Sequence, residues 1–529
     1  MNISQSSQIK QLALLLKEHR LLIVALTIAL AVRLLFLFFY PELNFPDAKG
    51  YRTIGEELLS HKLITNHIYM PLYPLLTAIS GSKFNSLILD ILISTSTVFV
   101  IYILSFKIFS SKFSAIFSAL FASVYPHFIF YSISGLTETS FTFLTLLSFY
   151  FLYSKKYNLG IVTLVTGILI KPSFDLLNPF LIFTFAHLIH CEGFRKSFFL
   201  VIRYLIVYSL FMTPWWIHQY TKYNEFVRLT LADGIILYSG NNEINKTGGG
   251  IGRRNGESDV DFSKFEKIKN PIEKNNAMKD AAFNFISDNK IRFVELAGLK
   301  FVRFWRLWPY ADEYSQWHII ASSLLSYGVV LILSLYFLFI ASPYFLKILI
   351  PVFITFLYLT LVHMITIGSI RYRFPLEPFL IIFSGYVFKE KFGKLQNLDI
   401  YKAIKSKYLN FTFIRFLFIG VINTLFGLSI IFALKYFLNF SDIYANLFGY
   451  ITGFLFSFFM HGKHTFKFNG NIKAAVLRYL LIIISAYLSN LSIVLHLIDL
   501  GVNSYISQTL GLIPYILVSY FGSKYFVYK

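Results

Sequence analysis

Asp47 is the acidic side chain whose position in this sequence best suits proton transfer. It lies about seven residues after the first long apolar run, residues 21–40, within the segment Phe45–Tyr51. A carboxylate near a membrane surface can accept a proton from a hydroxyl or amine nucleophile. Helical spacing of apolar residues over Tyr51–Leu59 predicts that a helix begins beside Asp47. The alternative is that Asp47 only caps this helix.

Three basic residues lie in or beside apolar segments, and their charge in such a setting needs a physical explanation. Lys171 follows the apolar triplet Ile168–Ile170, and a charge at bilayer depth costs about 2.5–3.5 kcal/mol on insertion scales. Arg371 and Arg373 lie beside a proline, where both guanidinium groups could donate forked hydrogen bonds to one phosphate. The alternative is that all three extend to the headgroups as interface anchors. Glu138 is predicted either to steady an acceptor or a loop, or to pair with a nearby basic residue.

The elements that carry these residues are predicted to be membrane-spanning helices. The chain has 529 residues, of which 56% are hydrophobic and 14% charged, and its mean hydropathy is +0.61. Apolar runs of about 20 residues recur from residue 21 to residue 523, and each is long enough to cross a hydrocarbon core of roughly 30 Å. Helices satisfy their own backbone hydrogen bonds in lipid. The predicted fold class is therefore all-α and polytopic.

The basic residues give a formal net charge of +21, but they are scattered through short loops. A nucleic-acid partner is not predicted, because such a protein concentrates its basic residues in one patch. The positive-inside rule instead predicts cytoplasmic loops and two cytoplasmic termini. We expect an integral protein of a prokaryotic inner or plasma membrane. The single cysteine, Cys191, excludes an intrachain disulfide and a cysteine-based metal cluster.

The apolar runs fall into two blocks. Residues 1–390 are predicted to form about ten spans, with an external loop at 41–83 and a small external domain at about 218–315. A basic cytoplasmic linker is predicted at 391–411, and four further spans at 412–529.

The loop after the first span has a distinctive order of residues. Asp47 is followed four residues later by Tyr51, then by an amphipathic helix and by Tyr69-Met70-Pro71-Leu72-Tyr73-Pro74. This order resembles the first external loop of GT-C membrane glycosyltransferases, in the branch of protein O-mannosyltransferases and aminoarabinose transferases. In that family the first acidic residue of the loop is the catalytic base. The resemblance therefore implies this role for Asp47.

Other landmarks agree with this resemblance, which covers about residues 15–390. They are Gly135-Leu136-Thr137-Glu138-Thr139, Pro214-Trp215-Trp216 and Arg371-Tyr372-Arg373-Phe374-Pro375-Leu376-Glu377-Pro378. Two positions depart from it: Ala48 replaces a second acidic residue of many relatives, and His218-Gln219 replaces the usual Arg-Asn. One carboxylate is a poor Mg or Mn site, so no cofactor is predicted and a divalent metal is not favoured.

The second block has its own pattern of residues. It contains Arg415-Phe416-Leu417, Gly420, Asn423, Ala445-Asn446, Gly449, Gly453, Phe459 and Gly462-Lys463-His464-Thr465-Phe466. This pattern resembles the GtrA-like four-helix membrane proteins, associated with translocating or handling polyprenyl-phosphate-linked sugars. A polar group inside a span must find a partner, so Asn423, Asn446 and Lys463 are predicted contacts of the carrier lipid. The alternative is that they join helices, which we favour for Asn446.

The two resemblances together imply an enzyme, a glycosyltransferase that uses a polyprenyl-phosphate-linked sugar as donor. The acceptor would be a lipid, a polysaccharide or a protein at the external face, and membrane lipids are the other expected partners. The predicted substrate-binding residues are Tyr51, Tyr69, Glu138, Lys171, Arg371 and Arg373. The alternative is a flippase or transporter of the same lipid-linked sugar, which performs no chemistry.

Overall fold

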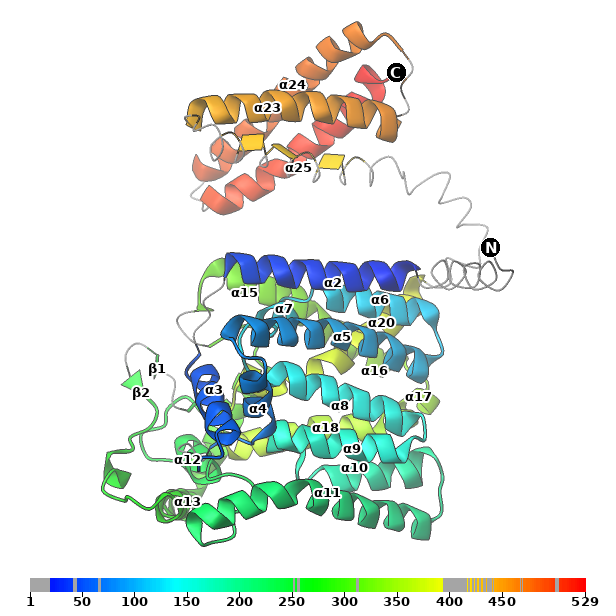
Figure 1. Cartoon of the computed structure of the whole chain (residues 1–529). Helices are drawn as coiled ribbons and strands as arrows, with labels where there is room; N and C mark the ends of the chain where they lie inside the picture. The colour runs from blue at the N-terminus through cyan, green and yellow to red at the C-terminus, as the bar shows by residue number, and fades with distance from the viewer. Residues whose placement is uncertain are drawn as a thin grey trace. The chain divides into compact units, whose positions relative to one another are not determined.

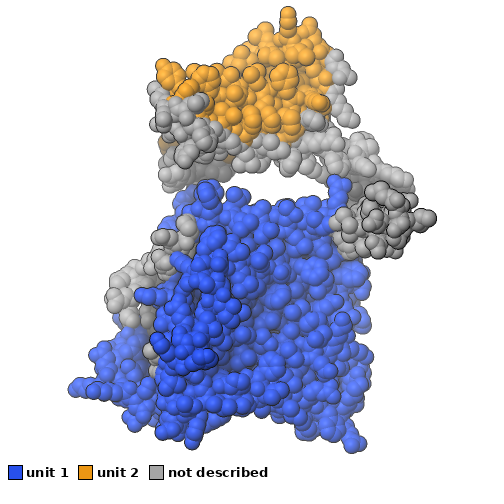
Figure 2. Space-filling model, in the orientation of Figure 1, with its two compact units in different colours: residues 1–393 blue, residues 394–529 orange. Residues whose placement is uncertain are grey.

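The computed structural model contains two compact units, residues Met1–Gly393 and Lys394–Lys529, which Figure 2 colours separately. It describes residues 20–40, 45–64, 68–250, 253–254, 257–310, 314–392, single positions between 416 and 440, 442–466, 468, 470–499 and 504–529. Apart from its first two residues, the predicted linker at 391–411 lies outside the described residues.

Apolar helices lie side by side in the first unit (Figure 1). They are α2 (Arg20–Phe39), α5 (Lys83–Phe109), α6 (Lys112–Ser123), α8 (Thr137–Tyr153), α9 (Tyr157–Ile170), α10 (Asn178–Thr184), α11 (Phe194–Tyr223), α16 (Val329–Ile340), α18 (Ile350–Ile365) and α20 (Glu377–Phe392). Helix α5 contacts α2, α6 and α8, while α20 contacts α6 and α16. The core of this unit therefore lies between helices from its N-terminal and C-terminal parts.

The described helices include five that are long and apolar enough to cross a membrane. They are Arg20–Phe39, Lys83–Phe109, Phe194–Tyr223, Trp317–Ile340 and Ile472–Ile498. The shorter apolar helices are Lys112–Ser123, Tyr157–Ile170, Asn178–Ile189 and Ile350–Ile365. Only one two-stranded hairpin, two residues per strand, accompanies the helices of the described ranges. The predicted all-α, polytopic membrane fold is confirmed.

Shorter elements gather at one end of the helix bundle (Figure 1). They include α3 (Pro46–Leu59), α4 (Leu72–Ile79), α12 (Asp233–Gly240), β1 (Arg253–Arg254), β2 (Glu257–Ser258) and α13 (Pro271–Asp288). The remaining short helices of the unit are α7 (Pro126–Tyr131), α14 (Lys290–Trp305), α15 (Trp317–Ser323), α17 (Pro343–Ile348) and α19 (Ile370–Arg373). Both polar segments that were predicted to lie outside, 41–83 and about 218–315, thus contribute to the same end of the bundle.

Helices α13 and α14 follow each other directly, because Asn289 is both the C-cap of α13 and the N-cap of α14. Helix α14 packs against α18 and α19. Its fully buried Lys300 donates hydrogen bonds to Asn241 Oδ1 at 2.9 Å and to the Ile365 carbonyl at 3.0 Å. Burial lowers the pKa of Lys300 to about 7. These bonds fix the polar segment to the helix bundle.

Helices α3 and α4 form a tight pair. Pro46 begins α3, which is a position where its missing N–H costs nothing. Tyr51, Ile54 and Gly55 form the buried face of α3. A Cβ at Gly55 would lie 2.0 Å from the carbonyl oxygen of Pro74, so only glycine permits this approach. The pair fixes the segment that begins with Asp47.

The second unit contains α23 (Asp442–Met460), the π-turn η8 (His461–Phe466), α24 (Ile472–Asp499), α25 (Ser504–Gly522) and η9 (Ser523–Val527). Helices α24 and α25 pack against each other. A small core forms around Phe458, Tyr479 and Tyr528, and the Tyr528 hydroxyl donates to the Phe458 carbonyl at 2.8 Å. The described helices of this unit are consistent with a compact helical block.

We predict that Gly55→Ala lowers the stability of the first unit by about 1–3 kcal/mol, because the added methyl group forces α3 away from α4. Thermal unfolding of the purified protein in detergent measures this. Gly298→Ala is the matched control, since a methyl group added at Gly298 in α14 would meet no atom within 4 Å. This control should be neutral or slightly stabilising. An unchanged midpoint for Gly55→Ala would contradict the close packing of the pair.

Candidate active site

Four charged residues that are far apart in the sequence meet at the end of the first unit that carries α3. Asp47 lies in the first turn of α3, Glu138 in the first turn of α8, Lys171 at the C-terminus of α9 and Arg371 in α19. A carboxylate at a helix N-terminus is stabilised by the helix dipole, so the two acidic residues occupy favourable local positions. We call these four residues the Asp47 cluster.

Asp47 uses both of its oxygens outside its own helix. Oδ2 accepts a hydrogen bond from Arg371 Nη1 at 2.7 Å, and Oδ1 accepts one from the Tyr69 hydroxyl at 2.8 Å. The N-cap residue of α3 is Phe45, and no side-chain hydrogen bond caps the helix there. The capping alternative for Asp47 is therefore wrong. The Asp47 side chain is 33% exposed, so it remains open to a reactant.

Tyr69 serves as a neutral donor to Asp47. Burial raises the pKa of the Tyr69 hydroxyl, and the neighbouring Asp47 carboxylate raises it further. The ring of Tyr69 packs on Tyr51, with 4.5 Å between the centroids. Tyr51 in turn packs on Tyr73 and is only 4% exposed. Of the two predicted substrate-binding tyrosines, Tyr69 thus contacts the carboxylate directly, whereas Tyr51 lies behind it.

Glu138 is fully buried and is paired with two cations. Its carboxylate accepts from Arg371 Nε at 2.5 Å and Nη2 at 3.3 Å, and from Lys171 Nζ at 2.6 Å. The chain reaches this position through Gly135, whose φ of +63° favours glycine and where an added Cβ would approach Ala48 to 3.2 Å. Of the alternatives for Glu138, the structure shows pairing with basic residues.

Lys171 and Arg371 occupy breaks in their helices. Helix α9 ends at Ile170, before Lys171, whose backbone is extended because Pro172 follows. Arg371 lies just after Ser369, whose hydroxyl accepts from the Arg371 backbone N–H at 3.3 Å. Arg371 bridges the two carboxylates, while Lys171 contacts only Glu138 among them. Two carboxylates and two cations make the Asp47 cluster neutral.

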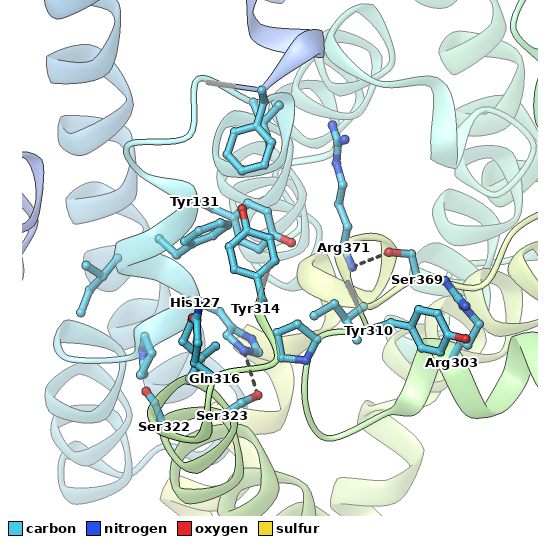
Figure 3. A pocket seen from close by; sticks show the side chains of 18 of the residues that line it. His127, Tyr131, Arg303, Tyr310, Tyr314, Gln316, Ser322, Ser323, Ser369 and Arg371 are labelled. Carbon is cyan, nitrogen blue, oxygen red and sulfur yellow. Dashed lines mark hydrogen bonds between the residues drawn. The ribbon is translucent and has the colours of Figure 1, made fainter. Parts of the chain in front are cut away.

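A cavity of about 1600 Å³ opens beside this cluster, and Arg371 lines it (Figure 3). Asp47 is not among the lining residues, but Phe45, two residues before it, is. One wall is apolar and belongs to α2, with Leu35, Phe36 and Phe39. The opposite, polar part includes residues of the segment that was predicted as an external domain: Glu243, Lys246, Thr247, Asp259, Arg303 and Tyr310. The cavity can therefore hold a ligand with an apolar and a polar part.

Arg373 lies outside the Asp47 cluster, although the sequence led us to expect it on the same ligand as Arg371. It is fully buried, donates from Nε to Glu377 at 3.0 Å and from Nη1 to the Phe304 carbonyl at 3.0 Å, and also donates to the Arg306 carbonyl. Its guanidinium lies 3.5 Å from the centroid of the Tyr327 ring. The reason is that residues two apart in a helical turn point to different sides.

In the second unit, the three predicted lipid contacts are placed differently. Asn423 is half-buried, with Oδ1 lacking a hydrogen-bond partner among the described residues. Lys463 lies in η8 and is exposed. Asn446 lies in α23, and its side chain is outside the described part of the structure. Their roles toward a carrier lipid remain predictions.

Several residues around the cavity were not predicted from the sequence. His127, Ser323 and Arg303 line it, and Glu377 holds His127 from behind. Glu377 follows Arg373 by four residues, which is the spacing of a helical ion pair and could have indicated that contact. His127 lies in the six-residue helix α7, where no periodic pattern marks it.

Comparison with known proteins identifies the second unit. Residues 415–528 match the family model of the GtrA/DPMS transmembrane domain. The predicted GtrA-like character of this block is confirmed. No curated protein sequence matches the chain.

Similar solved structures include an oligosaccharyltransferase from Archaeoglobus fulgidus in the apo form, with 12% identity and a TM-score of 0.45 over 87% of this chain and 57% of that chain. AglB from the same organism, in complex with an inhibitory peptide and a dolichol-phosphate, has 11% identity and a TM-score of 0.46 over 88% and 58%. This chain thus spans less than three fifths of both proteins.

ArnT from Cupriavidus metallidurans bound to undecaprenyl phosphate has 13% identity and a TM-score of 0.38 over 96% of this chain and 77% of that chain. With identities of 11–13% and TM-scores below 0.5, these structures carry no argument about the activity of this chain.

We predict that Glu138→Gln lowers stability by about 3–5 kcal/mol, because it leaves the largely sheltered Lys171 without a carboxylate and Arg371 with Asp47 alone. Thermal unfolding in detergent measures the loss. Glu192→Gln is the control, since its partner Lys196 is 62% exposed and exposed ion pairs contribute little to stability. The double variant Glu138→Gln/Lys171→Gln restores neutrality and should recover part of the loss. Equal midpoints for Glu138→Gln and Glu192→Gln would refute the buried cluster.

Proposed function

We propose that this chain, whose residues 415–528 form a GtrA/DPMS transmembrane domain, is a glycosyltransferase. Its first unit would move a sugar from a polyprenyl-phosphate carrier to a hydroxyl or amine acceptor at the external face of the membrane. The observation that carries the proposal is the partly exposed Asp47 carboxylate, held by Arg371 and Tyr69 beside a large amphipathic cavity. The sequence resemblance to GT-C transferases supports it.

Asp47 acts as the general base in this proposal. The acceptor oxygen or nitrogen bonds to the anomeric carbon, its proton passes to Asp47, and the bond from that carbon to the phosphate oxygen breaks. The electron pair leaves with the phosphate. Tyr69 and Arg371 keep the carboxylate oriented, which places the base before the acceptor arrives.

The cavity supports a lipid-linked donor. Its α2 wall, with Leu35, Phe36 and Phe39, suits an isoprenoid chain, and its polar part suits a sugar and an acceptor. Arg371 lines the cavity and has five N–H hydrogens, of which three make the hydrogen bonds to Asp47 and Glu138. The two others can contact a phosphate oxygen as negative charge develops there.

The GtrA/DPMS domain would supply or collect the carrier lipid in this proposal. The lipid that one unit handles is a substrate or product of the other, and a covalent link raises its local concentration. Asn423, Asn446 and Lys463 remain our candidates for contacts with the carrier.

We predict that Asp47→Asn abolishes sugar transfer while the protein still binds the donor. The amide keeps the shape of the side chain but cannot accept the proton. Transfer of a radiolabelled sugar by the purified, reconstituted protein measures this. Glu56→Gln is the matched control on the same helix, because Glu56 is 61% exposed and pairs only with Arg52. Full transfer by Asp47→Asn would end the assignment, and donor that crosses the bilayer intact would support a flippase.

We also predict that deletion of residues 394–529 preserves transfer when donor is added to the purified first unit in excess, but lowers it in cells. This deletion removes the second compact unit, which begins at Lys394, and leaves the first unit, which ends at Gly393, intact. The ratio of cellular to reconstituted transfer is the measurement. An unchanged ratio would show that the second unit has no part in carrier supply.

A further inference from the structure

A second ionic cluster borders the same cavity. Glu377 is 1% exposed and lies between two basic side chains: Arg373 Nε donates to Oε1 at 3.0 Å, and His127 Nδ1 lies 2.8 Å from Oε2. His127 Nε2 lies 3.3 Å from Ser323 Oγ. His127 and Ser323 both line the cavity, as Figure 3 shows. We call Arg373, Glu377, His127 and Ser323 the His127 cluster.

The two side chains that face the ring nitrogens of His127 are both hydrogen-bond acceptors. The Ser323 hydroxyl lies 2.5 Å from the Leu307 carbonyl oxygen and must donate its one hydrogen there, because a carbonyl has none. Ser323 Oγ can therefore only accept from His127 Nε2. The carboxylate of Glu377 likewise can only accept from Nδ1. The imidazolium form, with a hydrogen on each ring nitrogen, is the form of His127 that satisfies both contacts at once.

The two clusters differ in net charge. The Asp47 cluster is neutral, because Asp47 and Glu138 balance Lys171 and Arg371. With His127 in the imidazolium form, the His127 cluster has two cations for the single carboxylate of Glu377. It therefore carries one surplus positive charge. A charge in a sheltered site is costly without a counter-ion, and the His127 side chain is 14% exposed toward the cavity.

The surroundings of His127 limit what the counter-ion can be. The rings of Tyr125 and Tyr327 pack on the His127 ring at centroid distances of 5.4 and 6.2 Å. A neutral phenol has no negative charge, so neither tyrosine is the counter-ion. On the cavity side, Ile319 of α15 and Phe36 of α2 continue the apolar wall. A ligand beside His127 would thus place an anionic group on the imidazolium and an apolar chain along α2.

The two clusters are coupled through the cavity wall. Tyr131 lines the cavity and packs on Phe374, with 4.4 Å between ring centroids. Its hydroxyl interacts electrostatically with Glu138 and Arg371 of one cluster and with Glu377 and Arg373 of the other. Tyr131 therefore lies close to charged side chains of both clusters.

We propose that His127 is the anion-binding residue of the cavity and that it binds the phosphate group of a long-chain isoprenoid phosphate through Nε2–H. The inference rests on the proposed function for the identity of the lipid. The 3.3 Å contact with Ser323 is long for a hydrogen bond, so a phosphate oxygen can replace it with a shorter, charge-assisted one. His127 then holds the carrier while Asp47 faces the acceptor.

Binding to the full-length protein in nanodiscs tests this inference, with undecaprenyl phosphate, undecaprenol and inorganic phosphate as separate probes. His127→Gln should weaken undecaprenyl phosphate binding about tenfold or more, because a charge-assisted hydrogen bond is lost. Undecaprenol binding should not change. Inorganic phosphate should compete only weakly with the lipid, and equal competition would identify free phosphate as the ligand and overturn the lipid assignment.

Two further variants separate binding from structure. Ser323→Ala frees Nε2–H without changing the charge and should maintain or strengthen undecaprenyl phosphate binding. His190→Gln is the control, since His190 Nε2 lies 2.8 Å from the Leu152 carbonyl and His190 does not line the cavity. A purely structural role of His127 would instead weaken binding of undecaprenol and undecaprenyl phosphate alike.

Nitrogen-15 spectra of histidine-labelled protein, with the His127→Gln variant for assignment, provide a direct readout of protonation. From its two acceptor contacts, we expect both ring nitrogens of His127 to carry hydrogens. A neutral ring, or undecaprenyl phosphate affinity of His127→Gln equal to that of the unaltered protein, overturns the inference. Loss of binding in His127→Gln together with an absence of any sugar transfer by the unaltered protein would refute the proposed function and leave the anion site standing.

Discussion

The guanidinium of Arg371 between Asp47 and Glu138 is the interaction on which the described site depends. Glu138 is fully buried, so its charge requires cations, and Arg371 and Lys171 provide them. The remaining edge of Arg371 reaches Asp47, which is less buried. One side chain therefore fixes the position of a carboxylate that stays accessible. The buried ion pairs are needed less for net stability than for this orientation, because desolvation offsets much of their attraction.

The same short segment connects the two ionic clusters. Arg371 belongs to one, while Arg373 and Glu377, a few residues later, belong to the other. The helical turn between them points successive side chains to different sides, so one peptide segment contributes Arg371 to the neutral Asp47 cluster and Arg373 and Glu377 to the His127 cluster. In the function that we propose, the base lies in the neutral cluster and the phosphate binds at the positively charged one, and this arrangement suits the charge of each group.

Much of the site could be predicted from the sequence, but its pairing could not. Asp47, Glu138, Lys171 and Arg371 were each marked by a charge in an apolar setting or by a motif, and all four meet in the structure. Their partners lie up to 324 residues apart in the chain, and apolar periodicity indicates which face of a helix is buried without indicating its neighbour. Arg373 does not share the carboxylate partners of Arg371, because the two side chains point to different sides of a helical turn. His127 gave no signal, since it lies in a short helix without a pattern.

The most direct measurement is an experimental structure of the full chain with a non-hydrolysable polyprenyl-phosphate sugar bound. The account predicts the isoprenoid chain along α2, the phosphate at His127 and Arg371, and the anomeric carbon facing Asp47, with room for an acceptor between them. A donor bound elsewhere, with its sugar remote from Asp47, would contradict the account.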